Sequence, residues 1–143
     1  DQTSWTFVQG VLAPVQFVVF LVSLGLVINF FITGSGQTVA LFSVVLKTII
    51  LYIIMITGSI WEKVVFGKYL FADSFFWEDV FSILVLLLHT IYIVSLIVPT
   101  ATVDQQLSIA LAAYFAYLIN AIQFLMKFRI ASVESREKIG GMV

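Results

Sequence analysis

The sequence predicts an all-α integral membrane protein, a four-helix bundle in one domain of residues 1–143. Hydrophobic residues make up 62% of the chain and charged residues only 10%, whereas about 25% of an average soluble domain is charged. A folded chain of 143 residues exposes much of its surface, and water would not tolerate so much apolar surface. The composition therefore argues against a soluble enzyme and against a disordered chain.

Four segments are apolar over the roughly 20 residues that a helix needs to cross a bilayer. They are residues 11–32, 38–61, 80–98 and 107–126. The first and the fourth are uncharged, the second contains Lys47, and the third contains His89. None of them alternates apolar and polar positions as a barrel strand does. Because a helix satisfies its own backbone in lipid, all four are predicted to be helices.

The predicted connections differ in length and charge. A Gly-Ser-Gly turn at residues 34–36 joins the first two spans, and residues 99–105 join the last two. Residues 62–79 are predicted to form a loop, which is dense in charged side chains. Residues 129–143 form a tail of mixed charge, which we expect to extend the last helix beyond the membrane.

The distribution of basic residues predicts the orientation. Four spans place both termini and the loop on one side, and that side carries every Lys and Arg outside the spans: Lys63, Lys68, Lys127, Arg129, Arg136 and Lys138. The positive-inside rule therefore predicts that both termini are cytoplasmic. Tyr69 and Trp77 fit an aromatic belt at the same interface. No basic segment precedes the first span, so we expect no signal peptide.

Lys47 and His89 are the ionisable residues inside the predicted spans, and such residues are functional candidates by default. Both lie roughly 14 Å from the far side at 1.5 Å per residue. At that depth Lys47 is too deep to snorkel easily, which favours a structural or electrostatic role in the bundle interior. His89 fits two interpretations equally well, an interhelical hydrogen bond or ligation of a metal that a ligand carries.

The third span carries a polar stripe on one helix face: Glu78, Ser82, His89 and Tyr92. Glu78 and His89 are about 16 Å apart along the axis, so together they could contact only two parts of one large ligand. A purely structural interpretation is that Glu78 and Asp79 interact favourably with the positive N-terminal end of the third helix. Asn120 and Gln123 share a face of the fourth span, where amides usually form helix–helix hydrogen bonds.

Several functional classes are excluded by composition. The net charge of −1 carries no nucleic-acid signature. Without cysteine, the chain has no disulfide framework, cysteine-ligated metal site or thiol nucleophile. A single histidine excludes a bis-histidine haem. Composition and spacing alone do not name a reaction.

Longer motifs indicate a family. Residues 58–72 read GSIWEKVVFGKYLFA, and residues 75–82 read FFWEDVFS. Further stretches are VLAPVQF at 11–17, SLGLV at 23–27, LHT at 88–90, AAY at 112–114 and NAIQF at 120–124. This pattern resembles the 3-vinyl (also named 2-vinyl) bacteriochlorophyllide hydratase family, from about residue 5 to residue 127.

The resemblance implies a hydro-lyase of bacteriochlorophyll biosynthesis. It also implies a location in the bacterial inner membrane, which means the cytoplasmic or the intracytoplasmic membrane. Such an enzyme adds water to the C3-vinyl group of a chlorophyllide or bacteriochlorophyllide and gives a 3-(1-hydroxyethyl) group. We expect no cofactor, because the substrate macrocycle carries its own magnesium. The expected partners are the pigment and membrane lipid but no nucleic acid. A homo-oligomer or association with other pigment-biosynthesis proteins stays open.

The resemblance also suggests roles for particular residues. His89 is expected to ligate the substrate magnesium axially, and Lys63 or Lys68 to pair with the substrate propionate. Three carboxylates are candidates for proton donation and water orientation: Glu78, Asp79 and Glu62. Glu78 ranks first as the acid because it shares the stripe with His89. Further substrate contacts are expected from Lys47, Tyr69, Trp77, Ser82, Tyr92, Asn120 and Gln123.

Two other classes remain open at this stage. A non-catalytic pigment-binding or assembly subunit of a photosynthetic complex needs only His89 and packing, whereas an enzyme also needs a carboxylate for proton delivery. A scaffold or small transporter component is the third option. Broken spans or repeats would favour a transporter, and the sequence shows neither.

Overall fold

The computed structural model describes residues 4–98 and 100–141, except for the side chains at 74, 128 and 130–141. Its elements are α1 (Ser4–Thr33), α2 (Gln37–Phe66), the 3-10 turn η1 (Asp73–Phe75), α3 (Phe76–Ile97) and α4 (Val103–Gly141). Within these residues there is no strand, and four helices are long and apolar enough to cross a membrane. The all-helical prediction is therefore confirmed. The expected 99–105 connection and 129–143 tail each include positions outside the described residues.

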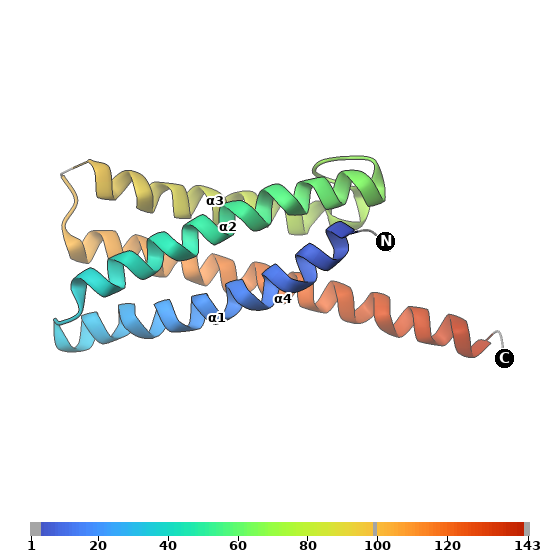
Figure 1. The fold of residues 1–143 in the computed structure, drawn as a ribbon, viewed down its shortest axis with the longest axis horizontal. Coiled ribbons are helices and arrows are strands. Elements are labelled where there is room, and N and C mark those ends of the chain that lie inside the picture. The colour runs from blue at the N-terminus through green and yellow to red at the C-terminus, as the bar shows by residue number, and fades with distance from the viewer. Residues whose placement is uncertain (1–3, 99, 142–143) are drawn as a thin grey trace.

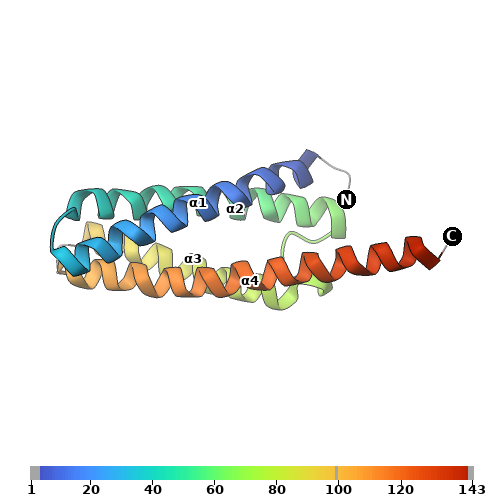
Figure 2. The same ribbon diagram turned by 90° about the horizontal axis from the view of Figure 1, so that it is seen from below.

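The bundle consists of two antiparallel helical hairpins, α1–α2 and α3–α4, which lie side by side (Figure 1). The helices pack closely within each hairpin and make fewer contacts between hairpins. The start of α1, the segment 67–75 and the C-terminal part of α4 share one end of the bundle, from which α4 projects (Figure 2). We call this end the loop end, and the opposite end the far end.

Local sequence explains where the helices begin and end. At the far end, Gly34 and Gly36 adopt positive φ angles of 73° and 79°, which the tight turn between α1 and α2 requires. Thr102 and Gln105 form a capping box before α4: the Gln105 N–H donates to Thr102 Oγ1 at 3.1 Å, and the Thr102 N–H donates to Gln105 Oε1 at 2.9 Å.

The helices extend well into the segment 62–79, which its charge density marks as a loop. α2 continues through Phe66 and α3 begins at Phe76, so the irregular part covers residues 67–72 and is followed by η1. Charged residues such as Glu and Lys are good helix formers. They therefore continue a helix past the point where its apolar run ends.

Polar side chains are concentrated inside the bundle. The buried polar residues are Gln16, Ser23, Lys47, Thr48, Glu62, Asp79, Ser82, His89, Ser95 and Asn120. Large apolar side chains cover the outside instead, for example Phe42, Leu87 and Phe115. Lipid solvates an apolar exterior, while buried polar groups must find partners inside the protein. The interior is therefore where the functional groups lie.

Candidate functional site

A pair of buried carboxyl groups lies at the loop end. Glu62 on α2 is 4% exposed and Asp79 on α3 is 5% exposed, and their side chains hydrogen-bond each other. Ionised carboxylates can only accept hydrogen bonds, so this hydrogen bond requires a proton. Two carboxyl groups this close do not both ionise, which is the arrangement of an acid–base dyad.

The segment 67–75 covers this pair and binds it through its backbone. The Phe71 N–H donates to Asp79 Oδ2 at 2.8 Å, and the Ala72 N–H donates to Glu62 Oε2 at 2.8 Å. Phe71 has a φ of 61°, a left-handed conformation that costs a non-glycine residue roughly 1–2 kcal/mol. Successive N–H groups beside such a residue form a concave anion-binding nest. The carboxyl pair and the strained loop therefore depend on each other.

Aromatic side chains cluster at the loop end, around the last residue of this segment. Phe75 is 5% exposed. Its ring lies 5.7 Å from Trp61, 5.6 Å from Phe66 and 5.8 Å from Phe124, measured between ring centroids. This cluster joins α2, η1 and α4 at the end of the bundle that holds the carboxyl pair.

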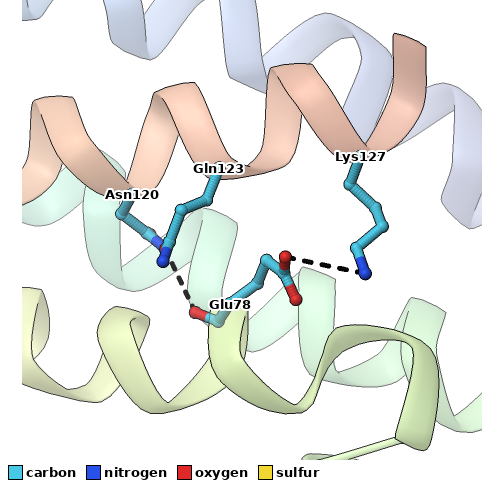
Figure 3. A network of polar contacts seen from close by, with 4 residues as sticks. All are labelled: Glu78, Asn120, Gln123 and Lys127. Carbon is cyan, nitrogen blue, oxygen red and sulfur yellow. Dashed lines mark hydrogen bonds and ion pairs between the residues drawn. The ribbon is translucent and has the colours of Figure 1, made fainter. Parts of the chain in front are cut away.

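Glu78 has a different environment from Asp79. Its Oε2 atom is 3.7 Å from Lys127 Nζ, and its backbone oxygen accepts hydrogen bonds from Ser82 Oγ at 2.8 Å and Asn120 Nδ2 at 3.1 Å. Asn120 also accepts from Ser82 Oγ at 3.0 Å and donates to Gln123 Oε1 at 3.1 Å. Figure 3 shows these α4 side chains directed at Glu78 on α3. A polar strip thus joins α3 and α4 beside the carboxyl pair.

A second polar centre, around Lys47 and His89, lies deep in the bundle. Both residues are fully buried, and they are close enough to interact electrostatically. The Tyr114 ring borders both, with its centroid 5.6 Å from Lys47 Nζ and 5.8 Å from the His89 ring centroid. Lys47 Nζ donates to Gln16 Oε1 at 3.2 Å and lies 3.6 Å from the Tyr117 ring centroid.

His89 has one satisfied ring nitrogen and one that is not. Its Nδ1 atom is 2.9 Å from the Val85 backbone oxygen. A carbonyl can only accept, so Nδ1 carries the proton and Nε2 presents a lone pair. Nε2 is buried and has no hydrogen-bond partner. A neutral imidazole fixed in this way by a backbone carbonyl is the usual form of a metal-ligating histidine.

Hydroxyl groups link helices in the interior, both within the α1–α2 hairpin and between the hairpins. Ser23 Oγ is 2.6 Å from the Tyr114 hydroxyl and 2.7 Å from Ser43 Oγ. The Tyr92 hydroxyl donates to the Leu41 backbone oxygen at 3.1 Å. These contacts tie α1 to α4 and α3 to α2 around the second centre.

The two centres are separate. Asp79 and His89 are ten residues apart on α3, which is roughly 15 Å along the axis. The expected stripe of α3 does face inward, since Ser82, His89 and Tyr92 are all buried. The pairing of Asp79 with Glu62 has no signal in the periodicity of α3, because it depends on the fold of the segment 67–75. Gln16 of α1 is an amide that, like Asn120 and Gln123, the sequence suggests for helix–helix hydrogen bonds, and the structure places it on Lys47 of the second centre.

The remaining candidates lie at the surface of the loop end. Lys63 Nζ donates to the Gly67 backbone oxygen at 3.0 Å and lies 5.5 Å from the Tyr69 ring centroid. Lys68, Tyr69 and Trp77 are exposed. They belong to neither buried centre and suit contact with lipid headgroups or an entering ligand.

Comparison with known proteins identifies the family. Residues 1–130 match the family described as 2-vinyl bacteriochlorophyllide hydratase. The chain is 56% identical over 134 residues to the 2-vinyl bacteriochlorophyllide hydratase of Cereibacter sphaeroides, covering 94% of this chain and 83% of that protein. It is 53% identical over 141 residues to the protein of that name in Rhodobacter capsulatus, covering 99% and 82%. No solved structure matches. These matches confirm the resemblance seen in the motifs, and the chain therefore belongs to the 2-vinyl bacteriochlorophyllide hydratase family.

Proposed function

We propose that this chain is a hydro-lyase of bacteriochlorophyll biosynthesis that adds water to the vinyl group of a bacteriochlorophyllide-type pigment, giving a 1-hydroxyethyl group. Membership of the family supports the activity. The observation that carries the chemistry is the buried Glu62–Asp79 pair, whose carboxyl groups are close enough to share a proton. A pigment-binding subunit without catalytic activity has no need of such a pair.

The proposed reaction begins with transfer of the shared proton to the terminal vinyl carbon. The positive charge then lies on the carbon attached to the ring, where the macrocycle delocalises it. Water adds to this carbon, and its surplus proton returns to the carboxylate that Glu62 and Asp79 now share. One C–H bond and one C–O bond form, and the vinyl double bond becomes single. Hydration involves no net oxidation or reduction and so needs no redox cofactor. We therefore propose no cofactor beyond the magnesium that the substrate brings.

His89 is proposed to hold the substrate magnesium through its free Nε2. The terminal vinyl carbon is five bonds from the magnesium, at most about 7 Å. The vinyl group of a macrocycle held by His89 can therefore point along α3 toward Ser82, which lies seven residues from His89, or roughly 10 Å. The carboxyl pair is roughly 15 Å from His89 on the same scale. Water bound to Ser82 and Asn120 would therefore relay the proton across the remaining gap.

For the orientation, we propose that the loop end faces the cytoplasm of a bacterial inner membrane. Basic side chains gather at this end, among them Lys63, Lys68 and Lys127. The turn at residues 34–36 and residues 100–102 at the far end contain no Lys or Arg. The asymmetry supports the orientation by the positive-inside rule.

The test replaces each acid by its amide in detergent-purified protein supplied with a vinyl pigment. Glu62→Gln or Asp79→Asn should lower kcat by at least about 100-fold, the usual contribution of general acid–base catalysis, while pigment binding persists. Glu78→Gln is the matched control and should retain most of its activity, because Glu78 is paired with Lys127 instead. Product is followed by the gain of one water in mass and by the pigment absorption.

Two outcomes would contradict this proposal. Full turnover in both amide variants would remove the carboxyl pair from the reaction. Tight binding by the wild-type protein with no gain of mass would instead favour the pigment-binding subunit.

A further inference from the structure

Lys47 is buried in the bundle without an acidic partner among the described residues. Its Nζ atom contacts the Gln16 side-chain oxygen at 3.2 Å and the Tyr117 ring at 3.6 Å from its centroid, and both of these groups are neutral. An ammonium group has three hydrogens to donate, and Gln16 accepts one. Buried charged groups in proteins are normally paired with an opposite charge. The position of Lys47 therefore suits a ligand that brings a negative charge.

The distance from His89 matches such a ligand. The propionate carboxylate of the pigment is joined to the magnesium through about seven bonds, a reach of at most roughly 9 Å. Lys47 is within electrostatic range of His89, and both contact the Tyr114 ring. A macrocycle held by His89 can therefore place its carboxylate at Lys47.

The lysines at the loop end do not match this distance. Lys63 immediately follows Glu62, which pairs with Asp79, and Lys68 lies in the exposed segment beyond it. Both are at the end of the bundle that lies roughly 15 Å along α3 from His89. A propionate on a macrocycle held by His89 would not reach them.

We propose that Lys47 binds the propionate carboxylate and makes the enzyme selective for the free acid over an esterified pigment. This assignment rests on the proposed function, since it takes the pigment as the ligand. Esterification removes the negative charge and would leave Lys47 buried and unpaired beside the ligand.

The test compares the free acid and the methyl ester of one vinyl pigment, each titrated into the detergent-purified protein. The wild type should bind the acid about 10- to 100-fold more tightly than the ester, the size of one lost charge-assisted contact. Lys47→Met keeps the side-chain length and removes the ammonium, so it should bind both pigments about as the wild type binds the ester. Lys47→Arg should keep part of the preference, and the control Lys63→Met should keep all of it.

Ester binding also reports whether the Lys47→Met protein is folded. A wild type with no preference for the acid would overturn the proposal without any variant. So would a Lys47→Met protein that keeps the preference, or one that loses affinity for both pigments equally. A wild type that selects the acid but adds no water would overturn the proposed hydration and leave this assignment in place.

Discussion

Among the side chains that the structure describes, His89 differs from the other buried polar groups because one of its ring nitrogens has no hydrogen-bond partner. A buried polar atom left unsatisfied costs a protein roughly 1–3 kcal/mol. The free Nε2 atom is best explained as a position that a ligand completes.

A His89→Ala variant should bind the pigment more weakly than the wild type. Loss of the axial bond should weaken binding at least about tenfold, equivalent to roughly 1.4 kcal/mol, and added imidazole should restore part of the affinity. Absorption titration of the detergent-purified protein measures both effects. Ser95→Ala is the matched control, because Ser95 is buried on the same helix and its hydroxyl, the group that the substitution removes, donates to the Tyr92 backbone oxygen of that helix. Equal pigment affinity in the His89→Ala and wild-type proteins would rule out axial ligation of the magnesium by His89.

The sequence predicts part of this residue-scale geometry. The depth of Lys47 and His89 follows from their place in two apolar runs, and the structure brings them together around Tyr114. The Glu62–Asp79 pair does not follow from any periodicity. It depends on a backbone turn at Phe71 that a local sequence pattern does not specify, because φ of 61° is unusual for phenylalanine.

At the scale of elements, the segment 67–75 controls the carboxyl pair. It leaves α2 at Gly67, where φ is 84° and the N–H donates to the Lys63 backbone oxygen at 2.9 Å. It returns to α3 through η1 after placing two N–H groups on Glu62 and Asp79. The end of α2 therefore sets the path of the chain that holds the acids in place.

Gly67→Ala should consequently destabilise the protein by roughly 1–2 kcal/mol, because alanine is strained at this φ although its Cβ would meet no atom. Activity should fall as well, since the same segment binds the carboxyl pair. Gly25→Ala is the control: Gly25 lies inside α1, its Cβ would also meet no atom, and alanine favours a helix. Unfolding in detergent monitored by circular dichroism measures both changes. A Gly67→Ala protein as stable as the wild type would contradict the assigned strain.

Helix boundaries show why elements are only partly predictable. Apolar runs indicate which part of a helix lies in lipid. The four helices contain the four expected runs, except that α3 ends one residue before position 98, the end of the third run. The apolar runs do not indicate where a helix ends, because polar helix formers continue it beyond the membrane. α2 therefore continues to Phe66, past the apolar run that ends at residue 61 and into the segment expected to be a loop.

At the scale of the whole molecule, the two hairpins enclose the reactive groups. Few polar contacts join the hairpins, among them Ser23 with Tyr114 and Tyr52 with Thr90, the latter at 2.7 Å between hydroxyl oxygens. His89 and Lys47 are fully buried, so a pigment can reach them only if interior side chains or whole hairpins move apart. Close packing within each hairpin and looser contact between them favour the seam as the place where this movement occurs.

Single cysteines test the orientation of the whole molecule in the membrane. Because the chain contains no cysteine, one introduced cysteine is its only thiol. Ser35→Cys places a thiol in the exposed turn at the far end, and Lys68→Cys places one in the exposed segment at the loop end.

In spheroplasts, a thiol reagent that cannot cross the membrane should label the first variant, and should label the second only after the membrane is opened, because the basic loop end is expected to face the cytoplasm. The reverse pattern would invert the orientation. Labelling of both in intact spheroplasts would mean that the four helices do not separate the two ends.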